Sequence, residues 1–295
     1  MIRTILILAI LLACGLPPAL PLAAPSSPLT ALVTGSTSGI GLHTAQRFAS
    51  SGHRVIIHGR TQEKVDSALA TLEALEGTVE HLGVVGDLCT IAGCRSVASK
   101  VLSLISCLDI LVNNCGVFET DLTLTSDNLE KTFAVNVLSP HIITTALLPI
   151  LPPKSRIAFV SSISMADGSP TINFDDLQFF NKNYDKYEAY GHSKRLTAMY
   201  AKELSRRLSP AEESPLVISC DPGTVNTAML RKGWGSCGVE LDRADNEFLL
   251  STMEWDEKYH GDYFVGCRKT IPHQEVNDEE KGRKLFGLLE ALLES

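Results

Sequence analysis

The stretch of sequence that decides the fold is Thr34-Gly35-Ser36-Thr37-Ser38-Gly39-Ile40-Gly41. It follows a short apolar run at residues 30–34 and leads into an amphipathic stretch at residues 40–51. Three glycines let the chain turn tightly and bring backbone N–H groups against a pyrophosphate at a helix N-terminus, where the macrodipole favours an anion. The spacing TGxxxGxG alone also suits a plain turn. Its place between a strand and a helix favours a dinucleotide-binding turn.

The rest of the chain alternates short β-rich runs with longer amphipathic stretches, which predicts a parallel sheet covered by helices on both faces. Strands are expected at residues 30–34, 54–58, 79–85, 108–113, 156–161, 216–220 and 263–265. Helices are expected at residues 40–51, 61–75, 90–105, 126–150, 186–208 and 278–293. We therefore expect one α/β domain over residues 28–295, a doubly wound parallel sheet (Rossmann fold) of about seven strands.

Composition excludes several classes of function. Of the 295 residues 44% are hydrophobic and 20% charged, the net charge is −8 and the sequence pI is about 5.5. No basic stripe is visible, so we expect no nucleic-acid partner. The eight cysteines include no CxxC pair, and the eight histidines form no HExxH motif, so no metal site is expected.

The N-terminal segment, residues 1–24, differs in kind from the rest. One positive charge at Arg3 precedes a nearly unbroken apolar run at residues 4–13, and Leu22-Ala23-Ala24 offers a small-residue cleavage site. This layout is typical of a secretory signal peptide. Residues 4–24 are also long enough for a membrane anchor. Leu11-Leu12-Ala13-Cys14 additionally resembles a bacterial lipidation box.

The end of the second expected strand bears on the choice of cofactor. An acidic residue at this place bonds the ribose 2′-hydroxyl of NAD in dinucleotide-binding sheets. Here the position holds Gly59, and Arg60 follows it. A guanidinium can bind a 2′-phosphate through a fork of donors, whereas an acid would repel it. The sequence thus favours NADP (NADPH) over NAD, and Arg60 could otherwise be a solvated residue at a helix start.

A second chemical signal is Tyr190-Gly191-His192-Ser193-Lys194 on an expected helix. A spacing of four places Tyr190 and Lys194 on one helical face. A phenol with a pKa of about 10 is a poor acid or base near neutrality, and a neighbouring ammonium would lower that pKa. YxxxK alone is a common coincidence on helices.

Read in order, six signals resemble the short-chain dehydrogenase/reductase family over residues 30 to about 290. They are the TGxxxGIG turn, Asn113-Asn114-Cys115-Gly116, Asn136, Ser161-Ser162, Tyr190 with Lys194, and Asp221-Pro222-Gly223. The resemblance implies an oxidoreductase that moves hydride between a nicotinamide and a carbonyl or alcohol.

The resemblance also implies a role for each matching residue. Tyr190 would protonate the carbonyl oxygen, Lys194 would lower the pKa of Tyr190 and bond the nicotinamide ribose, and Ser162 would hold the substrate oxygen. Asn136 would support a water linking Lys194 to solvent. The residues implied to bind the cofactor are Gly35, Ser36, Ser38, Gly39, Ile40, Gly41, Arg60, Asp87, Leu88, Asn113, Tyr190, Lys194, Pro222, Gly223, Val225 and Thr227.

The sequence departs from the family pattern in places. Cys115 stands where alanine is usual. The 28-residue interval from Ser162 to Tyr190, with Ile172-Asn173-Phe174-Asp175-Asp176-Leu177, resembles the branch of retinol dehydrogenases and the WW-domain-containing oxidoreductase. The interval from Thr227 to Gly261 is short for that branch, and Arg231-Lys232-Gly233-Trp234-Gly235 is expected as a loop. That shortening argues against retinoid specificity.

Several alternatives stay open from the sequence. The substrate is expected to be a lipophilic carbonyl or alcohol (retinoid-, steroid- or lipid-like), and a steroid- or sugar-directed enzyme is the runner-up. A non-catalytic cofactor-binding regulator and a secreted structural domain are the readings from other classes. We expect the endoplasmic reticulum membrane or the endomembrane system, with association through the N-terminus, or the secretory lumen after signal cleavage. A homodimer is left open.

Overall fold

The computed structural model describes residues 28–75, 77, 79–166, 170–208, 213–253 and 256–294. Its centre is an eight-stranded sheet in the order β3-β2-β1-β4-β5-β6-β7-β8. Neighbouring strands run parallel from β3 to β7, and only β7 and β8 pair antiparallel. The strands are β1 (Thr30–Val33), β2 (Arg54–Gly59), β3 (Leu82–Val85), β4 (Ile110–Asn113), β5 (Arg156–Val160), β6 (Leu216–Asp221), β7 (Asp262–Val265) and β8 (Arg268–Thr270).

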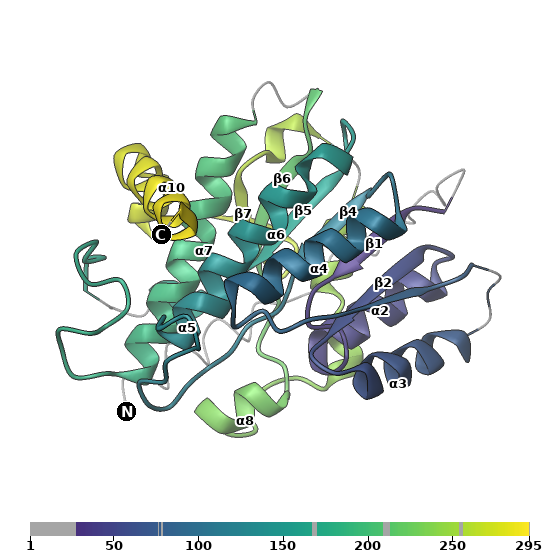
Figure 1. Ribbon diagram of the computed structural model, residues 1–295, viewed down its shortest axis with the longest axis horizontal. Coiled ribbons are helices and arrows are strands. Elements are labelled where there is room, and N and C mark those ends of the chain that lie inside the picture. Colours follow the sequence, from purple (N-terminus) through teal and green to yellow (C-terminus); the bar gives the residue numbers. More distant parts are fainter. Residues whose placement is uncertain are drawn as a thin grey trace.

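Helices cover both faces of the sheet (Figure 1). On one face lie α4 (Ile91–Leu104), α5 (Lys131–Phe133), α6 (Ser139–Leu147) and α7 (Lys186–Arg207), with α10 (Glu279–Glu294) against α7. On the other lie α2 (Gly39–Ser50), α3 (Gln62–Glu73) and α9 (Asn246–Thr252). The short helix α8 (Ala228–Trp234) lies at the lower edge in the view of Figure 1.

The strand sequences explain this layering. Adjacent residues of a strand point to opposite faces, so a strand buried on both faces is apolar throughout. In β1, Leu32 belongs to the core beneath α4 and α7, whereas its neighbours Ala31 and Val33 belong to the core beneath α2 and α3. All three side chains are completely buried. The predicted doubly wound single-domain Rossmann fold is therefore confirmed.

The structure corrects the expected elements at four places. The eighth strand, β8, was missed because its three residues are charged or polar and exposed. The third strand begins at Leu82 rather than 79. The expected helix over 126–150 begins at Lys131 and continues through a π-helical turn η1 (Ala134–Leu138) before α6. The interval from 227 to 261 holds α8 and α9, so residues 231–235 are not simply the expected loop.

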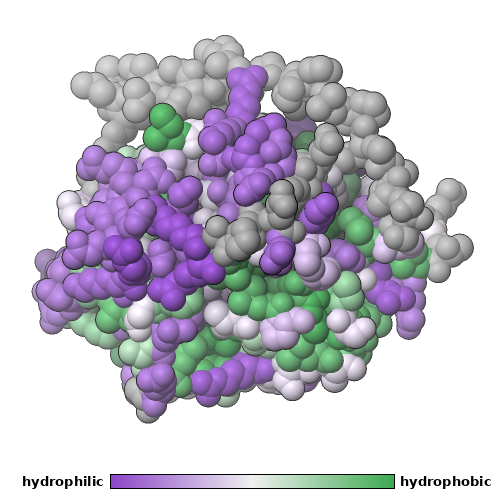
Figure 2. Space-filling model, turned by 90° about the horizontal axis from the view of Figure 1, so that it is seen from above, coloured by the Kyte–Doolittle hydropathy of each residue, from purple (hydrophilic) through white to green (hydrophobic). Residues whose placement is uncertain are grey.

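One described stretch, Lys131–Ile150, is long and apolar enough to cross a membrane, but 72% of its most apolar window is buried inside the domain. It is the central helix of the α4–α6–α7 layer, which explains its composition. The expected signal or anchor at residues 1–24 lies outside the described residues. On the face shown in Figure 2, polar residues fill much of the upper half of the view and apolar residues gather in the lower half.

Candidate active site

The glycine-rich turn forms the cradle expected from the sequence. Gly35 and Gly39 have φ angles of 66° and 58°, in the region that favours glycine. A Cβ on Gly41 would lie 2.3 Å from Nδ2 of Asn114, so only glycine fits there. Ser38 is the N-cap of α2, and its side chain makes no capping hydrogen bond. The first turn of α2 carries no acidic residue, so the helix N-terminus suits the pyrophosphate of a dinucleotide.

Neighbouring groups hold the turn in shape. The backbone N–H of Gly35 donates to Nδ1 of His58 over 2.9 Å, and the backbone N–H of His58 donates to Oγ of Ser36 over 2.9 Å. Burial lowers the pKa of His58 to about 4, so the ring is neutral and Nδ1 can accept. Ser36 is completely buried. The Ser36 hydroxyl therefore stabilises the turn from inside the protein, and it does not face a ligand as the resemblance implied.

The end of β2 and the start of α4 lie beside this turn. Arg60 is exposed, and its positive charge favours the thiolates of Cys89 and Cys115. Cys115 packs on the turn, with its Sγ 3.3 Å from where a Cβ of Gly35 would stand. Burial nevertheless raises the pKa of Cys115 to about 11, so its thiol stays protonated. Arg60 directly follows Gly59, and a Cβ on Gly59 would stand 2.4 Å from Cγ2 of Thr37 in the turn.

The other residues proposed near the adenine and β4 have structural partners. Asp87 accepts from the backbone N–H of Cys89 over 3.0 Å, and the Leu88 side chain is buried in the core. Asn113 donates to Oγ1 of Thr144 over 3.0 Å. Its neighbour Asn114, which the sequence reasoning did not select, donates to the carbonyl of Thr34 over 2.7 Å and so contacts the turn directly.

Tyr190 and Lys194 lie one turn apart on α7, as their spacing predicted. The Nζ of Lys194 is 5.6 Å from the centre of the Tyr190 ring and donates to the carbonyl of Val160 over 2.8 Å. Oγ of Ser161 donates to the carbonyl of Lys194 over 2.7 Å. These two bonds join the end of β5 to α7, which fixes Ser162 beside the tyrosine and the lysine.

Asn136 lies in the π-helical turn, completely enclosed. Its Oδ1 accepts from the backbone N–H of Val117 over 2.8 Å, and its Nδ2 donates to Oγ of Ser193 over 2.9 Å. The side chain therefore ties the segment after β4 to α7. A Cβ on Gly116 would stand 3.3 Å from Nζ of Lys194 and 3.4 Å from Oδ1 of Asn136. A side chain at residue 116 would therefore crowd both groups, and glycine avoids this contact.

The electrostatics of the site differ from the expectation in one respect. Burial, and after it the negative charge of Asp221, raise the pKa of Tyr190, whereas a hydrogen bond with Ser162 lowers it. The net shift of the Tyr190 pKa is thus upward, because the phenol is only 8% exposed and the carboxylate of Asp221 lies near it. Burial lowers the pKa of Lys194 to about 8, against the opposing charge of Glu247.

The loop after β6 returns to the glycine turn. Gly223 has a φ of 94°, and the carbonyl of Pro222 accepts from Nδ2 of Asn246 over 3.1 Å. Thr227 caps α8 by accepting from the backbone N–H of Leu230, and its methyl group lies 3.6 Å from where a Cβ of Gly39 would stand. The structure therefore brings this loop and the phosphate turn together, as the family resemblance implied. Val225 is buried beneath it.

Aromatic side chains pack against Tyr190. The ring centre of Trp234, on α8, lies 4.7 Å from that of Phe118 and 5.5 Å from those of Tyr187 and Tyr190. Lys232 fastens the same helix by donating to the carbonyl of Phe118 over 2.9 Å. We call Phe118, Tyr187 and Trp234 the aromatic wall. The sequence reasoning missed it, although Trp234 was the one bulky aromatic in the segment treated as a loop.

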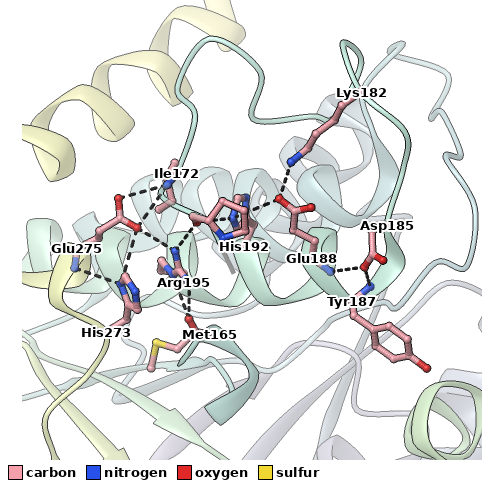
Figure 3. Close-up of polar contacts among 11 residues, drawn as sticks. Met165, Ile172, Lys182, Asp185, Tyr187, Glu188, His192, Arg195, His273 and Glu275 are labelled. Carbon is pink, nitrogen blue, oxygen red and sulfur yellow. Dashed lines mark hydrogen bonds and ion pairs between the residues drawn. The ribbon is translucent and has the colours of Figure 1, made fainter. Parts of the chain in front are cut away.

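A buried polar network, shown in Figure 3, fixes the long interval between Ser162 and Tyr190 against α7. Arg195 is fully buried and donates through Nη2 to the carbonyl of Met165 over 2.8 Å. Its Nη1 pairs with Oε2 of Glu275 over 2.8 Å, and Glu275 also accepts from the backbone N–H of Ile172. At the start of α7, Asp185 caps the helix by accepting from the backbone N–H of Tyr187 over 2.9 Å. The segment that follows Ser162 is thereby anchored to α7 through Arg195.

Within the described part of the chain, no group of three or more His, Cys, Asp or Glu residues could hold a metal ion. Two buried acids near the site were not selected from the sequence. Asp221 ends β6, and Glu247 on α9 accepts from Oγ1 of Thr44 over 3.1 Å. Glu247 carried no signal in the sequence, since only folding brings it near Lys194. Asp221 belongs to the Asp221-Pro222-Gly223 motif, but the motif alone gave no role for its side chain.

Comparison with known proteins agrees with this geometry. Residues 29–174 match the short chain dehydrogenase family model. The chain is 31% identical over 275 residues to retinol dehydrogenase 13 of Mus musculus, covering 87% of this chain and 81% of that protein. An uncharacterised protein from Mycobacterium paratuberculosis superposes with a TM-score of 0.74 at 24% identity, covering 92% of this chain and 97% of that one. A short-chain dehydrogenase from Escherichia coli CFT073 in complex with NADPH gives 0.66 at 23% identity, covering 81% and 97%.

The fold and the site define an oxidoreductase built on a dinucleotide-binding sheet. More narrowly, the chain belongs to the short-chain dehydrogenase/reductase family. The family binds a nicotinamide cofactor, and the glycine turn and the uncapped Ser38 at the start of α2 fit such a group.

Proposed function

We propose that this protein is an NADPH-dependent reductase, or the corresponding dehydrogenase, of a lipophilic carbonyl or alcohol. The observation that carries the proposal is the convergence of Tyr190, Lys194 and Ser162 under an aromatic wall. NADPH, when bound, supplies the hydride. The O–H of Tyr190 donates its proton to the carbonyl oxygen, and the ammonium of Lys194 stabilises the negative charge that the phenol then carries.

A regulator that binds the cofactor without turnover is the alternative. Such a regulator would not need the phenol of Tyr190, the hydroxyl of Ser162 and the ammonium of Lys194 to lie close together. The deciding experiment monitors nicotinamide absorbance while a panel of aldehydes and ketones, from short aliphatic to polyprenoid and steroidal, is mixed with NADPH and enzyme. Turnover of at least one lipophilic carbonyl is expected. A panel without turnover, from an enzyme that binds NADPH tightly, would favour the regulator.

The aromatic wall supports the apolar substrate class. The rings of Phe118 and Trp234 pack against Tyr190, and the ring of Tyr187 packs against both of them. Burying an aromatic face against an apolar ligand is worth about 1.5–3 kcal/mol. Trp234→Ala is expected to raise the KM for a large lipophilic carbonyl about tenfold, with NADPH affinity unchanged. Trp234→Phe, which keeps a ring, should retain most of the affinity. Equal KM values for wild type and Trp234→Ala would show that α8 does not line the substrate site.

The choice of NADPH over NADH rests on Arg60. No acid follows β2, and the exposed Arg60 directly follows Gly59, which packs on Thr37 of the glycine turn. Arg60→Ala should weaken NADPH binding about tenfold, the scale of one hydrogen bond to a charged group, and should leave NADH nearly unaffected. Lys64→Ala is the matched control, because it also removes one positive charge, from the first turn of α3. Equal affinities of the wild type for the two cofactors would overturn this assignment.

We further propose that residues 1–24 remain as an anchor at the endoplasmic reticulum, with the catalytic domain facing the cytosol. All seven cysteines of the described residues are free thiols, which suits a reducing compartment. The sequence contains no Asn-x-Ser/Thr acceptor. N-terminal sequencing together with protease treatment of intact microsomes tests this placement. A mature chain beginning near Pro25, or a domain shielded from protease, would indicate a cleaved signal and a lumenal enzyme instead.

A further inference from the structure

Arg195 follows Lys194 on α7, and its side chain is fully buried. Its guanidinium donates through Nε and Nη2 to the carbonyl of Met165, over 3.0 and 2.8 Å. Its Nη1 donates to the carbonyl of Pro170 over 3.0 Å and to Oε2 of Glu275 over 2.8 Å. Figure 3 shows the contacts with Met165 and Glu275. All the acceptors lie outside α7, so this one side chain joins the helix to segments before and after it.

The carbonyl that Arg195 holds twice belongs to the short helical turn η3 (Ile163–Ala166), which begins directly after Ser162. The backbone N–H of Met165 donates to the carbonyl of Ser162 over 3.2 Å. The backbone N–H of Ser164 donates to Oγ of Ser162 over 3.2 Å. A chain of hydrogen bonds therefore runs from Arg195 through η3 to both the backbone and the side chain of Ser162.

The bond from Ser164 fixes the direction of the Ser162 hydroxyl. A hydroxyl has two lone pairs that accept and one proton to donate, and the N–H of Ser164 occupies one of the lone pairs. The proton and the other lone pair remain for further partners. Without the N–H of Ser164, Oγ can rotate among its staggered positions. Displacement of a reacting group by about 1 Å can lower a rate about a hundredfold, so this direction matters for turnover.

Glu275 holds the guanidinium in its orientation. It lies on the short helix η7 (Gln274–Asn277), and its carboxylate also accepts from the backbone N–H of Ile172 over 3.2 Å and pairs with Lys281. A buried ion pair adds little net stability, because the loss of hydration offsets the attraction between the charges. The planar guanidinium gives direction instead, since its donors point along fixed lines to the Met165 carbonyl. The pair therefore contributes geometry more than stability.

We propose that Arg195 is a positioning residue: its guanidinium, oriented by Glu275, holds η3 so that the N–H of Ser164 fixes the Ser162 hydroxyl in the direction that turnover requires. The C-terminal part of the chain thereby acts on the site through Glu275. The effect on turnover rests on the reductase function proposed above, whereas the chain of hydrogen bonds from Arg195 to Ser162 does not.

Two substitutions separate the planar fork from the charge. Arg195→Met keeps an unbranched side chain and removes every donor. Arg195→Lys keeps a positive charge opposite Glu275 but lacks the fork that reaches one carbonyl with two N–H groups. Glu203→Gln is the matched control, because Glu203 is also buried on α7, about two turns beyond Arg195, and pairs with Arg207 over 2.9 Å. The control also loses a buried ionic contact, but its partner lies on α7 itself rather than on η3.

The first arm of the test needs no substrate. Hydrogen–deuterium exchange measures the protection of the backbone amides of Ser164 and Met165. These amides should exchange at least about tenfold faster in Arg195→Met, by an intermediate factor in Arg195→Lys, and at the wild-type rate in Glu203→Gln. Amides of α2, on the opposite face of the sheet, correct for global destabilisation. Equal corrected exchange of Ser164 and Met165 in wild type and Arg195→Met overturns the proposal.

The second arm measures kcat with saturating NADPH and a carbonyl that the enzyme turns over. Arg195→Met should lower kcat at least about tenfold in the wild type and less than about twofold in a Ser162→Ala background, with the dissociation constant of NADPH unchanged. Its melting temperature should fall equally in both backgrounds, and Glu203→Gln should lower the melting temperature alone.

An equal loss of kcat in both backgrounds shows an effect that does not pass through Ser162 and overturns the proposal. If Arg195→Met does not fold, Arg195→Lys carries both arms with the same expected directions. A panel without turnover refutes the proposed function, and the exchange arm still decides whether Arg195 holds η3.

Discussion

Tyr190→Phe is expected to bind NADPH with wild-type affinity and to lose two or more orders of magnitude in turnover, the usual scale of general acid–base catalysis. The ring of Tyr190 packs edge-on against Phe118 and Trp234, at 5.6 and 5.5 Å between ring centres. Phenylalanine preserves these contacts and removes only the hydroxyl. The substitution therefore separates proton transfer from packing.

The matched control for Tyr190→Phe lies on the same helix. Tyr200 is fully buried on α7, and its hydroxyl is 3.2 Å from Nδ1 of His141, away from the active site. Tyr200→Phe should lower thermal stability by about 1 kcal/mol through the lost hydrogen bond and keep normal turnover. Turnover and nicotinamide titrations on both variants check the pair. Near-normal turnover by Tyr190→Phe on a validated substrate would remove the phenol from the mechanism.

The parts of the molecule that could be predicted from the sequence are those with local signatures. The phosphate turn is visible because glycines are required where φ is positive or a Cβ would clash, as at Gly35, Gly39 and Gly41. The alignment of Tyr190 with Lys194 follows from helical periodicity alone. The layered fold follows from strands that are apolar on both faces, such as residues 110–112 of β4.

The parts that could not be predicted depend on packing between distant segments. Strand β8 consists of exposed polar residues, and only its pairing with β7 makes it a strand. The aromatic wall joins Phe118 to Trp234 across more than a hundred residues of sequence. The pKa of Tyr190 depends on its burial and on Asp221, and neither effect can be read from a YxxxK spacing. For this reason the spacing alone does not give the net shift of the Tyr190 pKa, which is upward.

The second large effect is expected at Lys194, because this side chain serves both the cofactor and the phenol. The lysine is buried, and its Nζ donates to the carbonyl of Val160 and lies 3.3 Å from where a Cβ of Gly116 would stand. Lys194→Ala should weaken NADPH binding at least about tenfold, through loss of one charged hydrogen bond to the ribose, and should lower turnover as far as Tyr190→Phe does. Lys202→Ala, two turns further along α7, is the control and should change neither quantity.

The lowered pKa of Lys194 adds a dependence on pH with a definite sign. A lysine with a pKa of about 8 carries its charge below that value and loses it as the pH rises through 8. Reduction of the carbonyl should therefore decline on the alkaline side of about pH 8, well below the ordinary pKa of lysine. Lys194→Arg stays charged at every accessible pH. Its residual activity should therefore lack this alkaline decline, and a decline at the same pH in Lys194→Arg would assign the titration to a group other than Lys194.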